Sequence, residues 1–427
     1  MKVLFVSLGC DKNTVDSEKI FKRFLTKYNF DVAVNDKDAD IVIINTCSFI
    51  HDAKKESLNY IRHYVELKKK GFIKKILVLG CLITENNITH EYDSLLNNVD
   101  VNLSLEKYLS DLDKLTSRTN DFLSFSSSIK ICDGCDKYCS YCIIPYLKGH
   151  FKSSEPKDIL QEAKELAKAG AREISIVGQD ILHYGFDFKN KNAGANKPIV
   201  PLINEISKIR GIEWIRLLYC YPEEIDDSVI NLIKDNSKVL PYIDMPIQHA
   251  SDKILRLMNR KTCKKSIKNT IYKLRTSVPN ICLRTTLIVG FPGETNEDFN
   301  ELLEFVKEIK FDKLGVFTYS REKLSKSYDF PMQISDRIKE MRKKLILDEQ
   351  MKIITRKNEE KIGYVYNSIV EGRDTSKKDT YIVRPYFNAR DIDDKVYVRS
   401  KDLLISGSFV NVEIKKSMGY DLIGELV

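Results

Sequence analysis

Three cysteines stand in one short run, Cys135-Asp-Lys-Tyr-Cys139-Ser-Tyr-Cys142, and this spacing constrains the chain more than any other feature. A [4Fe–4S] cluster has four irons and is held by thiolates, so a loop with three cysteines leaves one iron open to a ligand that is not protein. An open iron can bind a reactant directly. The loop therefore predicts a cluster that takes part in a reaction.

Cys132 lies three residues before Cys135 and raises the alternative of a structural zinc site with four thiolates. In a zinc ribbon, the two CxxC pairs are usually separated by a loop of about fifteen residues. Here only three residues lie between Cys135 and Cys139. The crowding favours an iron–sulfur cluster over zinc, with Cys132 as a spare thiol or an alternative ligand.

The size and composition of the chain predict a cytoplasmic protein with several domains. Its 427 residues exceed what one hydrophobic core usually supports, so two or three domains are expected. No apolar run is as long as the roughly eighteen residues of a membrane span, and the N-terminus meets charged residues too early for a signal peptide. The ten cysteines are expected to be metal ligands or buried thiols. The net charge of +8 permits an acidic partner such as RNA without requiring one.

A second set of three cysteines stands in the amino-terminal third of the chain. Three short, apolar, β-branched runs predict buried parallel strands, and each ends in a cysteine: Cys10, Cys47 and Cys81. Helical patterns separate the strands, the first with Asp16 as its expected cap, so this part is expected to be a small three-layer βαβ domain. Ligands bind outside the carboxyl ends of such strands, which would bring the three thiolates together. Free cysteines are often simply buried, but three at one sheet edge favour a second three-thiolate site. The strands are expected over residues 2–8, 40–46 and 75–80.

The central part alternates strand and helix and predicts a partial (β/α) barrel whose site gathers at the strand C-termini. Gln179 and Gln248 follow two of the expected strands, and Arg284 lies within a third. Glu294 ends a Gly-Phe-Pro-Gly-Glu turn before a helix with Thr295 as its expected cap. Each of these residues can also be purely structural. The strands are expected over residues 173–177, 214–219, 242–247, 282–289 and 314–318.

The last part of the chain predicts a different kind of domain. A long helix over about residues 335–361 leads into five short strands separated by Gly, Asp and Ser. Five short strands of this size predict a small β-barrel that binds RNA or a protein surface, or that only braces the core. The strands are expected over residues 364–371, 380–384, 395–399, 409–415 and 421–427.

The whole chain resembles the radical SAM methylthiotransferases, which join a domain with three cysteines on strand ends, a core with a CxxxCxxC loop and an OB-like TRAM barrel. The order of the domains and all six cysteines agree. The resemblance implies an N-terminal methylthiotransferase domain over residues 1–118, a radical SAM core over 119–358 and a TRAM domain over 359–427.

Within that family, the motifs resemble the branch that modifies an aspartate in small-subunit ribosomal protein number twelve. A branch that modifies an adenosine in transfer RNA would share every metal ligand and usually has a Gln-Met-Asn run after the first cysteine, which is absent here. Asp11 stands where the ribosomal-protein branch commonly has proline, and Ser48 where it has glycine. The matching motifs are SLGCDKN at 7–13, NTCSFI at 45–50, QD at 179–180 and RTT at 284–286.

The resemblance implies two [4Fe–4S] clusters and S-adenosylmethionine, the first cluster with an open iron that holds S-adenosylmethionine and the second with an open iron for the inserted sulfur. It implies cofactor contacts from Gln179, Gln248, Arg284 and Glu294. A ribosomal protein or subunit is the implied substrate of a monomeric enzyme, with an electron donor and a sulfur donor that the sequence leaves unidentified. The alternative from another class is a zinc-stabilised, non-catalytic RNA-binding protein. The implied ligands of the first cluster are Cys135, Cys139 and Cys142, and those of the second are Cys10, Cys47 and Cys81.

Overall fold

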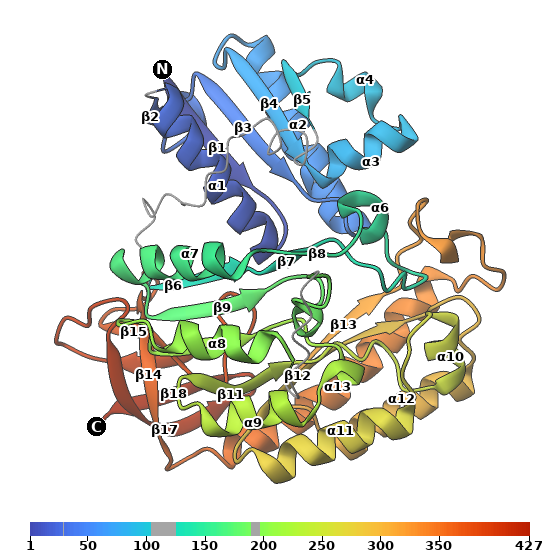
Figure 1. The fold of residues 1–427 in the computed structure, drawn as a ribbon, viewed down its shortest axis with the longest axis vertical. Helices are drawn as coiled ribbons and strands as arrows, with labels where there is room; N and C mark the ends of the chain where they lie inside the picture. The colour runs from blue at the N-terminus through green and yellow to red at the C-terminus, as the bar shows by residue number, and fades with distance from the viewer. Residues whose placement is uncertain (29, 104–124, 189–196) are drawn as a thin grey trace.

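The computed structural model describes residues 1–28, 30–103, 125–188 and 197–427, which form three bodies in chain order (Figure 1). The N-terminal domain, in blue, lies above the central sheet, and the C-terminal barrel, in red, lies beside it at the lower left. The predicted domain boundary between residues 118 and 119 falls outside the described residues. Within them, no helix combines the length and apolarity needed to cross a membrane.

The N-terminal domain is a parallel sheet of five strands in the order β2-β1-β3-β4-β5. Its three central strands match the prediction, and two short strands extend the edges. Helix α1 begins at Asp11, directly after Cys10, so the prediction that Asp16 caps this helix was wrong. Asp16 lies inside α1 and is buried, and its carboxylate is paired with Lys130 instead of capping backbone N–H groups. The elements are β1 (Lys2–Ser7), α1 (Asp11–Tyr28), β2 (Asp31–Val32), β3 (Ile41–Thr46), α2 (His51–Lys69), β4 (Lys75–Gly80), α3 (Cys81–Thr89), α4 (Asp93–Leu96) and β5 (Val101–Leu103).

The central domain is a six-stranded parallel sheet in the order β13-β12-β11-β10-β9-β6, open between its two edge strands as a partial barrel is. The first strand, β6, was not expected from the sequence, because its Ser-Ser-Ser-Ile-Lys run is not apolar. Thr295 caps α12 with the expected capping box, completed by Asp298. The strands are β6 (Ser126–Lys130), β9 (Glu173–Val177), β10 (Trp214–Leu217), β11 (Val239–Asp244), β12 (Cys282–Val289) and β13 (Lys313–Thr318). The longer helices are α7 (Pro156–Lys168), α8 (Ile199–Ser207), α9 (Asp227–Asp235), α11 (Lys264–Ser277) and α12 (Asn296–Ile309).

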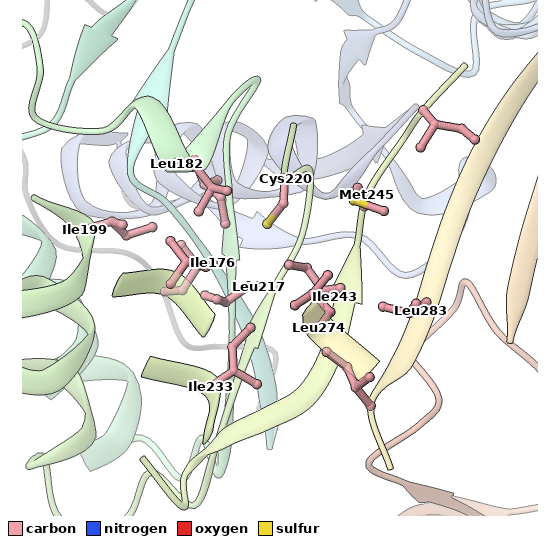
Figure 2. Packing of buried hydrophobic residues seen from close by; sticks show 14 of the residues in the cluster. Ile176, Leu182, Ile199, Leu217, Cys220, Ile233, Ile243, Met245, Leu274 and Leu283 are labelled. Carbon is pink, nitrogen blue, oxygen red and sulfur yellow. The ribbon is translucent and has the colours of Figure 1, made fainter. Parts of the chain in front are cut away.

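Apolar residues between the sheet and these helices hold the strand ends in register. Figure 2 shows one buried side chain from each of four neighbouring strands, with side chains from the covering helices packed against them. All of them are almost completely shielded from solvent, and a one-residue slip of any strand would turn its apolar set away from these helices and break the packing. The strand residues are Ile176, Leu217, Ile243 and Leu283, and those on the covering side include Ile199, Ile233 and Leu274.

The C-terminal domain is a closed barrel of five strands, as predicted, in the order β14-β15-β16-β18-β17. The predicted boundary between residues 358 and 359 falls in the last turn of the helix that leads into it. The barrel docks on the first residues of the central strands: Trp214 meets Phe409 ring to ring at 5.0 Å, and Glu173 forms a buried ion pair with Arg384. The opposite, carboxyl ends of the strands are thereby left to the N-terminal domain. The elements are α13 (Asp336–Glu359), β14 (Val365–Arg373), β15 (Thr380–Pro385), β16 (Val396–Arg399), β17 (Phe409–Met418) and β18 (Asp421–Leu426).

Candidate metal centres

The CxxxCxxC loop leaves the sheet just after β6 and is closed at its base by a small hairpin. Strands β7 (Cys132–Asp133) and β8 (Lys152–Ser153) pair on either side of the loop. The Cys135 N–H donates to the Gly149 carbonyl at 3.2 Å. Gly134 has φ +68°, and a Cβ there would lie 2.1 Å from the His150 carbonyl oxygen, so this close approach needs glycine. The hairpin fixes where the three cysteines begin and end.

Lys137, inside the loop, ties it to the core by charge. Its ammonium pairs with Asp180 at 3.2 Å and with Glu224 at 2.7 Å. The side-chain amide of Asn259 donates to the carbonyls of Lys137 and Tyr138 at 3.2 and 2.9 Å. The loop between the first two cysteines is therefore held by partners on three other segments of the core, which preorganises the thiols.

The three thiols of the loop lie close enough to affect one another, and two of them, Cys135 and Cys139, are buried. Burial raises the pKa of Cys135 to about 11, and the charge of Cys139 contributes to the rise. Burial also raises the pKa of Cys142 well above its usual range, with Cys139 and Cys135 adding to the effect. Thiols in this state become thiolates only when a cation replaces their protons, which is what metal binding does. The third thiol of the loop, Cys139 Sγ, lies 3.9 Å from the Tyr221 hydroxyl.

The strand-end cysteines also converge, as the sequence predicts for the carboxyl edge of a parallel sheet. Cys10 stands between β1 and α1, Cys47 follows β3, and Cys81 is the first residue of α3. Burial raises the pKa of Cys47 to about 12, and the charges of Cys81 and Cys10 add to the rise. The Ser57 hydroxyl accepts from the Cys47 N–H at 3.0 Å and donates to its carbonyl at 2.7 Å, which holds this cysteine in place.

The two sets of cysteines lie near each other at the interface of the N-terminal and central domains. The short helix α6 (Ile144–Lys148) follows Cys142, and Leu147 on it, together with Ile143 just before it, packs against Cys81. The positive charge of Lys12 opposes the raised pKa of Cys47 in one set and of Cys142 in the other. One ammonium group thus acts on thiols of both sets.

Cys132 does not point to this interface. It is 1 % exposed and belongs to the hydrophobic core, where its Sγ donates to the Asp180 carbonyl at 3.6 Å. A Cβ on Gly178 would lie 2.3 Å from that sulfur, so the thiol fills the space that glycine leaves. The position assigns Cys132 to packing and gives the four-thiolate zinc site no support.

Two of the four predicted cofactor contacts carry unpartnered polar atoms. The Oε1 atoms of Gln179 and Gln248 are buried and, within the described residues, have no hydrogen-bond partner. Gln248 adopts a left-handed backbone, φ 69°, and is held there by hydrogen bonds with the Thr286 carbonyl and the Ile288 N–H. Buried amides are normally paired, so these two fit a polar ligand such as S-adenosylmethionine at the strand ends.

The other two predicted cofactor contacts, Glu294 and Arg284, form ion pairs with residues of the protein itself. Glu294 accepts from the N–H groups of Gly290 and Phe291 at 2.6 and 3.1 Å, and from Arg342 at 2.8 Å. Burial raises the pKa of Glu294 to about 7. Its carboxylate therefore shapes the Gly290–Glu294 turn, and its direct contact with a cofactor stays a prediction.

Arg284 bridges the central domain and the barrel. Its guanidinium pairs with Asp244 at 2.8 Å and lies 3.6 Å from Asp393, a barrel residue that also accepts from the Tyr242 hydroxyl. Its contact with a cofactor likewise stays a prediction.

Sequence reasoning missed several residues around the thiols. Tyr219 and Tyr221 directly follow β10, and Arg260 stacks on the Tyr221 ring at 4.2 Å. Two tyrosines around a cysteine at a strand end were a signal that could have been noticed. Arg260 and Lys137 gave none, because their roles depend on contacts with residues far away in the chain.

Family models match all three bodies of the chain. "Radical SAM superfamily" matches residues 129–306, "TRAM domain" matches 362–427, and "Uncharacterized protein family UPF0004" matches 2–102. Among solved structures, the fold is similar to that of a radical S-adenosylmethionine methyltransferase, TsrM, from Kitasatospora setae, at a TM-score of 0.54 with 13% identity over 76% of each chain. Fold and cysteine loop together define a radical SAM enzyme, a class that implies a [4Fe–4S] cluster and S-adenosylmethionine.

Full-length relatives narrow the class. The chain is 40% identical to "Ribosomal protein uS12 methylthiotransferase RimO" of Lachnoclostridium phytofermentans over 99% of both chains. It is 42% identical to the protein of the same name from Acetivibrio thermocellus, over 100% of this chain and 98% of that one. This chain belongs to the RimO family of methylthiotransferases.

Proposed function

We propose that this enzyme inserts a methylthio group at the β-carbon of an aspartate in ribosomal protein uS12. The observation that carries the proposal is the pair of three-cysteine sets that lie near each other at one domain interface, with Lys12 acting on both. Sulfur insertion needs one site that activates a carbon and a second that holds sulfur beside it. The names of the relatives supply the substrate.

The residues present fit two clusters and S-adenosylmethionine. Cys135, Cys139 and Cys142 would hold the first cluster, and the strand-end cysteines Cys10, Cys47 and Cys81 would hold the second. When bound, the first cluster and S-adenosylmethionine supply a 5′-deoxyadenosyl radical able to remove hydrogen from an unactivated carbon, and a second S-adenosylmethionine supplies the methyl group. Gln179 and Gln248 are the proposed contacts to the cofactor, since their Oε1 atoms are buried and unpartnered in the described residues.

The chain itself holds the cluster loop in place and covers it. Lys137, Asp180 and Glu224 hold the cluster loop, and the N-terminal domain covers the carboxyl ends of the central strands. Excluding water protects a reactive intermediate from side reactions. The proposed substrate is the ribosomal protein or the ribosomal subunit that contains it, and the proposed location of the enzyme is the cytoplasm, where thiols stay reduced.

Mass spectrometry of uS12 and of transfer RNA from a strain lacking this protein tests the proposal. We expect uS12 to lose about 46 Da, the mass of the added sulfur and methylene, while the transfer RNA stays unchanged. Restoring the gene should restore the mass. Loss of a methylthio group from transfer RNA, with uS12 unchanged, would support the adenosine branch instead.

A further inference from the structure

Lys12 occupies an unusual position for a lysine. It is the second residue of α1, two residues after Cys10, and its ammonium nitrogen lies 3.7 Å from the centre of the Tyr219 ring. Tyr219 follows β10 with a left-handed backbone, φ 63°, which turns the residue out of the strand direction. Two elements from different domains therefore fix the ammonium group over the ring face, where a cation–π contact holds it.

The other lysines around the cysteine sets have a carboxylate within 4 Å, whereas Asp11 and Asp133 act on Lys12 only at longer range. Lys130 pairs with Asp16 and Asp133, Lys148 lies 3.6 Å from Asp16, and Lys137 pairs with Glu224. For Lys12, the described part of the chain offers neither an ion pair nor a hydrogen-bond acceptor to the ammonium, and the Tyr219 ring is its described contact. A half-buried ammonium with no carboxylate in direct contact can take up an anion that arrives from outside.

The location of this cation matches the reacting atoms of the proposed reaction. Lys12 lies two residues after Cys10, just beyond the loop that approaches Cys47 closely at Gly9, and its charge also acts on Cys142 of the other set. An aspartate side chain carries its carboxylate on the β-carbon itself. A cation that binds the carboxylate therefore fixes the position of the β-carbon to within one bond.

We propose that the Lys12 ammonium binds the carboxylate of the aspartate that is modified, and so places its β-carbon between the two cysteine sets. The proposal rests on the proposed function and adds to it the residue that recognises the target side chain. A point charge with three donors accepts a carboxylate from many directions, while the Tyr219 face restricts the ammonium to one side. Lys12 is thus a substrate-binding residue that favours aspartate over a neutral side chain of the same shape.

Binding to uS12 and to a uS12 variant with asparagine at the modified position tests the proposal. The enzyme is reconstituted anaerobically with iron, sulfide and S-adenosylmethionine and is kept unreduced, so that binding is measured without turnover. We expect the wild-type enzyme to bind the aspartate form about 10- to 100-fold more tightly, as a charge-assisted hydrogen bond in a shielded site would give. Lys12→Met should bind both forms equally, at the level of the asparagine form, and Lys12→Arg should keep part of the preference.

The matched control is Lys74→Met, which removes an exposed lysine paired with Asp40 on the far part of the N-terminal domain. It should keep the full preference for aspartate. Equal affinity of the wild-type enzyme for both forms of uS12, or an unchanged preference in Lys12→Met, would overturn the proposal. Iron content shows whether Lys12→Met assembles its clusters. If it does not, the affinities of the wild-type enzyme for the aspartate and asparagine forms still test the proposal. If the wild-type enzyme methylthiolates uS12 and Lys12→Met still prefers the aspartate form, only the role of Lys12 is refuted. If the wild-type enzyme neither binds nor modifies uS12, the proposed function is refuted.

Discussion

The backbone of Gly9 lies directly against the sulfur of Cys47. A Cβ added to Gly9 would stand 2.9 Å from Cys47 Sγ and 2.8 Å from its Cβ, and Gly9 has φ +94°. A side chain at this position meets both a clash and an unfavourable backbone conformation. Glycine is therefore the residue that lets the loop carrying Cys10 approach Cys47.

Gly9→Ala should damage the strand-end site selectively. We expect the variant to lose about four of about eight irons per chain while it still cleaves S-adenosylmethionine, because the loop cysteines are untouched. Iron and sulfide analysis after anaerobic reconstitution measures this. Gly71→Ala is the matched control, since Gly71 has φ +80° with nothing within 4 Å of an added Cβ, and it should keep all of its iron. Equal iron loss in both variants would show that backbone strain, and not the contact with Cys47, is responsible.

Cys139→Ala and Cys132→Ala should behave in opposite ways. The first removes a ligand of the loop cluster, so both cleavage of S-adenosylmethionine and methylthiolation should disappear. The second removes a packed thiol from the core and should keep iron content and cleavage, at a cost of about 1 kcal/mol in the free energy of unfolding. Iron analysis and 5′-deoxyadenosine formation report both results. Cleavage abolished by Cys132→Ala would assign that cysteine to the metal site.

The buried pair of Glu173 and Arg384 should hold the barrel on the central domain. Glu173 is also paired with Arg216 at 2.9 Å, and all three side chains are nearly inaccessible to solvent. Arg384→Met should lower the free energy of unfolding by about 3 to 5 kcal/mol, because it leaves part of a buried carboxylate uncompensated. Denaturant unfolding measures this. Arg373→Met, which breaks an exposed pair with Asp379 on the same barrel, should change stability by less than about 1 kcal/mol.

Glu294 should make stability depend on pH. Burial raises its pKa from 4.5 to about 7, so the folded protein binds this proton more tightly than the unfolded chain does. The contribution is fully present below about pH 4.5 and is lost as pH rises through about 7, with a total on the order of 3 kcal/mol. We expect Glu294→Gln to remove this fall when its free energy of unfolding is compared with that of the wild type from pH 5 to about 7.5. A constant difference between the two proteins across that range would contradict the assignment.

The candidate metal ligands could be proposed from the sequence because their signals are local. The three loop cysteines form one short motif, and each strand-end cysteine follows an apolar run whose end can be located by composition. Parallel strands then bring these ends together regardless of the loops between them. The five strands of the barrel were also predictable, since turn residues punctuate them.

Contacts between domains could not be predicted from the sequence. Asp16 was predicted to cap a helix, yet it pairs with Lys130, 114 residues away, at the interface between two domains. The contact of Lys12 with the Tyr219 ring and the pairing of Glu173 with Arg384 depend in the same way on how the three domains pack together. Such docking follows from shape and charge across whole surfaces, for which no short motif exists.

The central claim, that two neighbouring sites divide carbon activation from sulfur insertion, is tested most directly by replacing Cys10, Cys47 and Cys81 with alanine together. The reconstituted, reduced variant is incubated with uS12 and S-adenosylmethionine, and both 5′-deoxyadenosine and the mass of uS12 are measured. We predict that 5′-deoxyadenosine still forms and that uS12 gains none of the about 46 Da of a methylthio group. Methylthiolated uS12 from this variant would contradict the account.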